Sequence, residues 1–172
     1  MNEEGNPTPQ AWQSRASVCA TECAKVFADF RLSPIMDVAD LLGAMFITNA
    51  DRLSKYWDDP RGFGAFIYSQ PEIGASAHQI ERLGWQLLVA RRIESGRVFK
   101  EWSPQFEKIY LMAKRLAHFG PSIPPGSDPS VFPEHLLLAI AEQADLEIAR
   151  RLLASGLQVE VLRRDVEKGI SQ

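Results

Sequence analysis

The sequence predicts an all-α fold, built as a single domain. Apolar residues recur every three or four positions along most of the chain, and the strict alternation that marks half-buried strands is nearly absent. The chain has 172 residues, of which 45% are hydrophobic and 24% charged, as expected of one soluble globular domain. The residues that begin the first helix of the second half are similar to those that begin the first helix of the chain, which predicts two imperfect helical repeats.

The first repeat is expected at about residues 8–70, after a flexible tail over residues 1–7. Its first helix is predicted to begin at Thr8–Pro9, because threonine caps helices and a first-turn proline costs no hydrogen bond. The stretch 31–34 ends it. A second helix is predicted from Asp37, which can cap it. Its apolar side is Val38, Leu41, Leu42, Met45 and Phe46.

Two further segments lie between this helix and the middle of the chain. Residues 50–57 are predicted to form a short third piece that ends at a turn. The stretch 62–74 contains glycines and a proline and is predicted to be irregular. A long connecting helix should then run over about 76–95. The side chains expected to be buried on it are Ile80, Leu83, Leu87, Leu88 and Ile93.

The second repeat is expected at about residues 102–168. It begins with Ser103–Pro104, as the first begins with Thr8–Pro9. Its first helix has one apolar side, formed by Trp102, Phe106, Ile109, Ala113, Leu116 and Ala117. A proline-rich loop, residues 120–130, follows.

Three shorter helices complete this repeat. Pro133 is predicted in the first turn of the next helix, with Leu136, Leu137 and Ile140 buried. Asp145 is predicted to cap the following helix. Gly156 should end that helix, in the left-handed conformation that glycine tolerates. The last helix is predicted over Val159–Lys168, and its buried residues are Val161, Leu162 and Val166.

The chemistry of the chain points away from several classes of function. The net charge of −3 gives no reason to expect nucleic acid as a partner. The two cysteines, Cys19 and Cys23, form no disulfide framework and suit a reducing cytoplasm, and no apolar run is long enough for a membrane span. No phosphate-binding loop, metalloprotease motif or nucleophile elbow is present. The expected protein therefore has no catalytic residue, cofactor or metal, and is a monomer.

The second half resembles the repeat of the N-terminal domain of Clp unfoldases. The residues that carry the resemblance are Trp102–Ser103, the small residues Ala113 and Ala117, the block Glu134-His135-Leu136-Leu137-Leu138-Ala139, and Gly156. In the first half, Asp40–Met45 aligns with His135–Ile140, but Ala39 stands where the glutamate would be. The resemblance implies two repeats related by a pseudo-twofold axis in one helical bundle.

The resemblance also implies a function. Domains of this family bind substrates, adaptors or regulators and have no catalytic activity of their own, so the expected partner is a Clp ATPase, an adaptor or a substrate. Some of them bind phosphorylated arginine, with the glutamate on the guanidinium and the serine or threonine near the phosphate. By position Glu134 and Ser103 match one such site, and Ala39 implies that the other is lost. The chain would then recruit Clp partners or compete for them.

An aromatic cluster in the middle of the chain offers further candidate contacts. Its members are Tyr56, Trp57, Phe63, Phe66 and Tyr68. They form either a cap over the core or a partly exposed anchor for a partner, because tyrosine and tryptophan supply much interface energy. We take Tyr56, Trp57, Phe66 and Tyr68 as candidate partner-binding residues.

Two alternatives remain open at this stage. The first is a small helical enzyme in which His78 or His118 works with a distant carboxylate. The second is a helical DNA-binding regulator that uses the arginine doublets Arg91–Arg92, Arg150–Arg151 and Arg163–Arg164. Zinc on Cys19 and Cys23 is a weaker hypothesis, since no second ligand pair accompanies them. His135 itself is expected to be structural, with one ring nitrogen on a backbone carbonyl.

Overall fold

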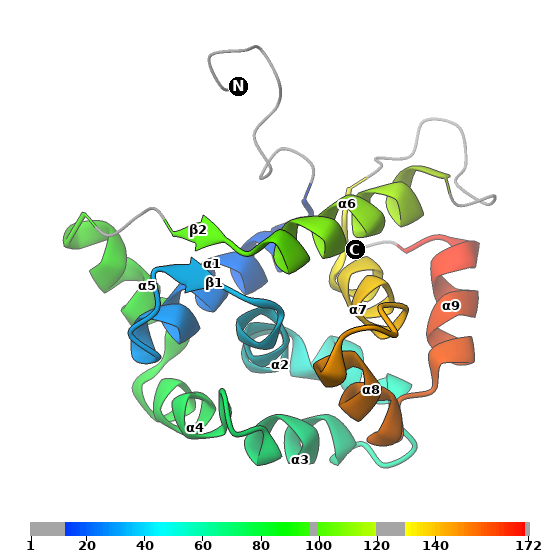
Figure 1. Cartoon of the computed structure of the whole chain (residues 1–172), viewed down its shortest axis with the longest axis horizontal. Coiled ribbons are helices and arrows are strands. Elements are labelled where there is room, and N and C mark those ends of the chain that lie inside the picture. The colour runs from blue at the N-terminus through cyan, green and yellow to red at the C-terminus, as the bar shows by residue number, and fades with distance from the viewer. Residues whose placement is uncertain (1–12, 97–99, 120–129, 171–172) are drawn as a thin grey trace, which may run out of the picture.

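The computed structural model describes residues 13–96, 100–119 and 130–170, with the side chains of 118 and 119 left out. These ranges are mostly helical, which confirms the all-α prediction (Figure 1). The elements follow in the order α1 (Arg15–Phe30), β1 (Ile35–Met36), α2 (Val38–Leu53), the 3-10 turn η2 (Ser54–Tyr56), α3 (Gly62–Ser69), α4 (Gly74–Leu83), α5 (Trp85–Glu94), β2 (Glu101–Trp102), α6 (Pro104–Phe119), α7 (Pro133–Ala141), α8 (Glu147–Ala154) and α9 (Val159–Lys168). The predicted tail, residues 1–7, and most of the predicted loop 120–130 lie outside the described residues.

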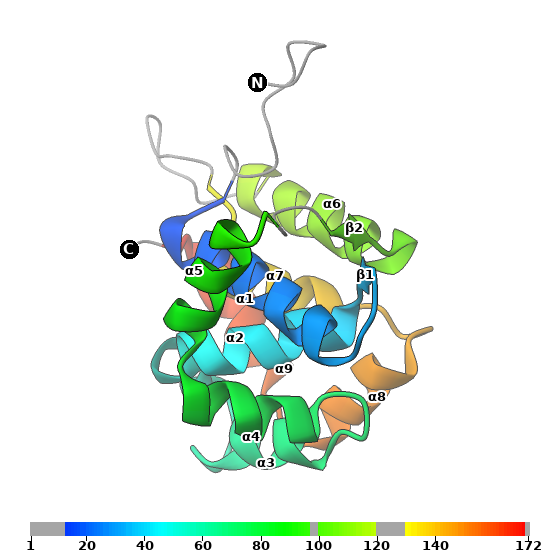
Figure 2. The ribbon, with the colours of Figure 1, turned by 90° about the vertical axis from the view of Figure 1, so that its left-hand side faces the viewer.

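The core forms around two central helices, α2 and α7, which contact each other. α1 packs along α2 and α6 packs along α7, and these are the two most extensive helix pairings. α3 and α4 lie together at the base of the molecule, on the side away from α6 (Figures 1 and 2). The central side chains are fully buried, among them Phe27, Leu41, Leu42, Met45, Phe106, Leu136 and Leu137. Burial of this apolar face, rather than helix propensity, supplies most of the stability of such a bundle.

The two halves exchange short backbone contacts at the starts of their helices. The segment before α6 forms strand β2, which pairs in parallel with β1, the segment before α2. Here the Ser103 N–H donates to Met36 O at 2.9 Å. The segment before α1 pairs in the same way with the segment before α7, where the Ser14 N–H donates to Val131 O at 2.9 Å. Each half therefore steadies the entry into a helix of the other half.

The start of the first helix differs from the prediction. Thr8 and Pro9 lie outside the described residues, and α1 begins at Arg15 with Ser14 as its N-cap. The Ser14 hydroxyl accepts a hydrogen bond from the Ser17 N–H at 3.2 Å. Ser14, rather than Thr8, is thus the residue whose backbone contacts match those of Ser103.

The prediction for residues 62–74 was wrong, since most of this stretch is helical. α3 spans Gly62–Ser69 and buries Phe63, Phe66 and Ile67. Glycine disfavours a helix by about 1 kcal/mol per residue relative to alanine. Burial of two phenylalanines and an isoleucine outweighs that cost.

The predicted connecting helix is broken in two. Gly84, at φ +90°, separates α4 from α5, and the chain leaves the first helix axis there. As a result three residues expected in the core are exposed: Leu83 at 44%, Leu87 at 50% and Ile93 at 59%. Arg92 is the buried residue of α5 and forms an ion pair with Asp29 of α1.

The second repeat follows its prediction more closely. α7 begins at Pro133, α9 spans Val159–Lys168, and Gly156 adopts φ +101° between α8 and α9. Asp145 was predicted wrongly as a cap, because Leu146 holds that position and makes no side-chain hydrogen bond there. Val161 is exposed rather than buried. Within the described ranges, none of the helices has both the length and the apolar content needed to cross a membrane.

Candidate binding pocket

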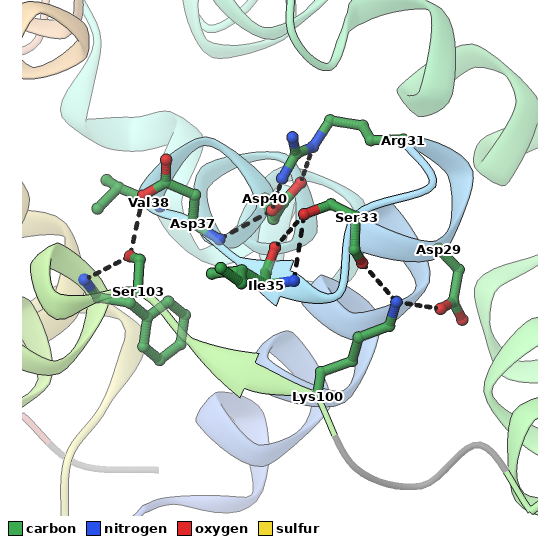
Figure 3. Close-up of polar contacts among 10 residues, drawn as sticks. Asp29, Arg31, Ser33, Ile35, Asp37, Val38, Asp40, Lys100 and Ser103 are labelled. Atoms are coloured by element: carbon green, nitrogen blue, oxygen red, sulfur yellow. Dashed lines mark hydrogen bonds and ion pairs between the residues drawn. The ribbon is translucent and has the colours of Figure 1, made fainter.

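Ser103 lies where the start of α6 meets the start of α2 (Figure 3). Its hydroxyl donates to Asp37 Oδ1 at 3.0 Å and accepts from the Phe106 N–H at 3.0 Å. The side chain is 6% exposed. Both hydrogen-bonding roles of the hydroxyl are therefore taken up within the chain, and Ser103 acts as the N-cap of α6.

The polar groups around Ser103 satisfy one another. Asp40 is fully buried and accepts from the Asp37 N–H at 2.9 Å and from Arg31 Nε at 2.8 Å. Beside it, Lys100 donates to the Ser33 carbonyl at 2.5 Å and forms an ion pair with Asp29 at 2.8 Å (Figure 3). This corner of the molecule is filled by its own side chains.

Glu134 lies in the first turn of α7, and its carboxylate contacts α2 rather than Ser103. Its Oε1 accepts a hydrogen bond from Arg52 Nε, and Glu134 is only 2% exposed. The guanidinium of Arg52 also stands over the Phe132 ring, 5.0 Å from its centroid. The structure therefore does not bring Ser103 and Glu134 into one site, and the guanidinium on Glu134 is the chain's own Arg52.

The serines near the start of α7 come from α1. Ser17 Oγ donates to the Val131 carbonyl at 2.7 Å, and the Ser14 N–H donates to the same oxygen. The prediction paired Glu134 with Ser103 because the resemblance places both in one site. The pairing of β1 with β2 instead places Ser103 beside the start of α2, and the bridge between Gln13 and Val131 places Ser14 beside the start of α7.

The second carboxylate oxygen of Glu134, Oε2, differs from Oε1 in its hydrogen bonding. Oε2 is buried, and none of the described residues donates to it. Glu134 lines a pocket of about 400 Å³ between α2, η2, α7 and the end of α9. The other lining residues are Arg52, Lys55, Tyr56, Asp165, Lys168, Gly169 and Ile170.

The opposite wall of the pocket is held by Tyr56. Its hydroxyl donates to Asp165 Oδ2 at 2.8 Å, which ties η2 to α9. Burial of the phenol, together with the Asp165 carboxylate, raises the pKa of Tyr56 well above its ordinary value of 10.0. Lys55 Nζ lies over the same ring, 5.2 Å from its centroid. Tyr56 therefore stays neutral, and the charged groups of the pocket are its three cations and two carboxylates.

His135 has a structural role in the first turn of α7. Its Nδ1 accepts a hydrogen bond from the Phe132 N–H at 2.9 Å, so the partner is a backbone amide and not the carbonyl that we expected. Burial, and to a lesser extent the Arg52 charge, lower the pKa of His135 to about 4. The imidazole is neutral at pH 7 and caps α7. His78 is exposed and stacks on Tyr68, with ring centroids 4.1 Å apart, and the His118 side chain lies outside the described part.

The aromatic cluster caps the core. Tyr56, Trp57 and Phe66 are 1%, 3% and 5% exposed, which agrees with the cap over the core and not with a partly exposed anchor. Trp57 stacks on Phe63 at a centroid distance of 4.3 Å and donates from Nε1 to Ser155 Oγ at 2.9 Å. Tyr68 is half-buried. Of the four candidates, Tyr56 is the one that lines the pocket.

One arginine of each doublet forms an ion pair inside the molecule. Arg92 pairs with Asp29, Arg151 with Glu72, and Arg163 with Glu142 and Glu160. Arg92 is buried and its pair links α5 to α1, whereas the pairs of Arg151 and Arg163 are the partly exposed kind common at protein surfaces. On α1, Cys23 is buried, and burial raises the pKa of its thiol above the ordinary value. No group of three metal-ligating side chains occurs among the described residues.

Sequence reasoning missed four of the residues that build the pocket with Glu134 and Tyr56. Arg52 and Lys55 belong to the segment predicted as a short third piece, and Asp165 and Lys168 to the last helix. The charge of each was visible, but no local pattern shows that three distant segments meet. Neither the protein-family models nor the curated proteins and solved structures that were compared with this chain gave a match.

Proposed function

We propose that this chain is a non-catalytic protein-interaction module and that it docks a segment of another protein in the pocket formed by α2, η2, α7 and α9. The observation that carries the proposal is Glu134 Oε2, a buried carboxylate oxygen in the pocket wall with no donor among the described residues. An unsatisfied buried acceptor costs about 1–3 kcal/mol. A bound molecule that supplies the missing donor would remove this cost.

The contrast between the two equivalent corners supports this choice of site. At the start of α2, the buried carboxylate of Asp40 receives hydrogen bonds from both Arg31 and the Asp37 amide. At the start of α7, Glu134 lines the pocket, its Oε1 accepts from Arg52, and its buried Oε2 receives no hydrogen bond from the described residues. A volume of about 400 Å³ is enough for one or two amino-acid side chains.

The resemblance to Clp N-domains suggests the class of partner. On that basis the chain would bind a Clp ATPase, an adaptor or a Clp substrate in the cytoplasm, and would recruit such proteins or compete for them. The chemistry of the site agrees with binding rather than catalysis in one respect: His135, which follows Glu134 in the chain, is neutral and engaged at Nδ1.

A capture experiment with matched variants tests the proposal. Tagged wild-type chain, Glu134→Gln and Glu107→Gln are incubated with host lysate, and a retained Clp ATPase or adaptor is identified by mass spectrometry. Glu107 is the first-turn glutamate of α6 and is exposed, so it controls for loss of one carboxylate at a helix start. We expect Glu107→Gln to retain the partner and Glu134→Gln to lose it. Equal retention by both variants would exclude the pocket, and a wild type that retains no Clp protein would exclude the partner class.

A further inference from the structure

We propose that Arg52 sets the specificity of this pocket and that the ligand is an acidic segment of a protein chain, bound through a carboxylate and the neighbouring backbone amide. This inference rests on the proposed function, because it assumes that the pocket docks a polypeptide. It departs from the expectation that Glu134 binds a cation of the partner, since that place is occupied from within the chain.

The first step is the charge of the pocket. Arg52, Lys55 and Lys168 line it with positive charge, against the carboxylates of Glu134 and Asp165. Both carboxylates already have partners inside the chain, Glu134 in Arg52 and Asp165 in the Tyr56 hydroxyl. Lys55 and Lys168 are exposed, and neither forms an ion pair with any residue that the structure describes. Three cations against two carboxylates leave the pocket lining with one positive charge in excess.

The second step is how firmly Arg52 is held. Its Nε donates to Glu134 Oε1, its guanidinium lies over the Phe132 ring, and its side chain is 26% exposed. An arginine fixed by both a carboxylate and an aromatic face keeps its orientation. A lysine or arginine of a partner would meet like charges from Arg52, Lys55 and Lys168 on its way to Glu134.

The third step is the unpartnered oxygen. Glu134 Oε2 needs an N–H donor, while the lysines need an anion. An aspartate or glutamate within a peptide offers both, because its backbone N–H lies a few bonds from its carboxylate. The side-chain carboxylate would bind the lysines at the mouth of the pocket, and the amide would point toward Glu134. Long-range attraction of this kind also speeds association at low salt.

Fluorescence anisotropy with two labelled peptides tests the inference. The probes are ten-residue peptides of alternating glutamate and glycine, or of alternating lysine and glycine, at low salt and at about 0.15 M salt. We expect the wild type to bind the glutamate peptide about tenfold more tightly than the lysine peptide, with a weaker difference at higher salt. Lys168→Glu and Lys55→Glu should each weaken binding of the glutamate peptide about fivefold or more. Arg82→Glu, an equal charge reversal at an exposed position of α4, should not.

Arg52→Gln gives the decisive comparison. Removing this charge leaves the buried Glu134 carboxylate without its cation, so the preference should move toward the lysine peptide. A melting curve checks that the variant folds, and the two lysine reversals test the site even if it does not. Tighter binding of the lysine peptide by the wild type, or no binding of either peptide, overturns the inference. If the lysine peptide binds and Glu134→Gln abolishes that binding, the pocket still docks a polypeptide and only the assignment to Arg52 fails.

Discussion

Asp40 and His135 hold the same position in two helices and make the same hydrogen bond. Each is the third residue of its helix, α2 or α7, and each accepts from the backbone N–H of the residue before that helix, at 2.9 Å. One acceptor is a carboxylate and the other a neutral imidazole. The carboxylate is buried and requires Arg31, whereas the imidazole needs no counter-charge.

Replacement of His135 by asparagine should remove a pH dependence of stability. The folded pKa of about 4 lies below the ordinary value of 6.5, so between these values the unfolded chain binds a proton that the folded chain does not. The free energy of unfolding should therefore fall as pH drops from 6.5 to 4, by about 3 kcal/mol in all. Asparagine can accept the same hydrogen bond without titrating. Urea unfolding at pH 4.5 and pH 7 measures the difference.

The control for this experiment is His78→Asn, at an exposed histidine of α4. It should keep the wild-type difference between the two pH values, while His135→Asn loses most of it. A His135→Asn protein with the full wild-type difference would show that other groups cause the acid sensitivity.

Asp40→Ala should destabilise the fold strongly. The substitution leaves the Asp37 amide without its acceptor and Arg31, which is 26% exposed, without its counter-charge. Breaking a buried ion pair from one side costs about 3–5 kcal/mol. Asp59→Ala is the matched comparison, because Asp59 and Arg61 form an exposed pair at 3.5 Å and exposed ion pairs contribute little to stability. Equal midpoints of thermal unfolding for the two variants would contradict this account.

The sequence predicted the parts of the fold that local signals control. Pro133 at the start of α7 and Gly156 after α8 act through their own backbone geometry, so their positions could be found without tertiary information. The break at Gly84 could not be predicted, because an isolated glycine is tolerated inside a helix. The turn there lets both α4 and α5 pack against α1, which is tertiary information. α3 was missed for the opposite reason, since burial of its aromatic residues overrides the glycines.

Local sequence patterns could not predict the pocket. Glu134 was identified, but the ion pair with Arg52 joins residues 82 apart in the sequence, and the Tyr56–Asp165 hydrogen bond joins residues 109 apart. Ser103 was paired with the wrong helix start because nothing in the sequence reports that the repeats exchange their entry segments. The aromatic cluster was ambiguous because aromatic residues serve both cores and interfaces.

Gly43→Ala should destabilise the contact between α1 and α2. A Cβ at this position would lie 2.6 Å from Cε1 of the Phe27 ring and 3.2 Å from Ile73 Cδ1. Overpacking of a filled core costs about 1–3 kcal/mol, more than the 0.5–1 kcal/mol that alanine gains over glycine in a helix. Gly64→Ala, whose nearest contact would be the Phe46 ring at 3.3 Å, should lose less stability. Denaturant midpoints compare the two, and Phe27→Leu combined with Gly43→Ala should recover part of the loss.

Leu32→Gly should not destabilise the protein, although it removes a large apolar side chain. Leu32 follows α1 at φ +57° and is 92% exposed, so it pays the cost of a left-handed conformation, about 1–2 kcal/mol, and buries almost nothing. Glycine relieves that strain but makes the unfolded chain more flexible, by about 0.4–1 kcal/mol, so the net gain should be up to about 1 kcal/mol. Leu32→Ala keeps the strain and should leave the unfolding midpoint unchanged. A midpoint lowered equally by both substitutions would mean that the leucine side chain packs against the fold in solution.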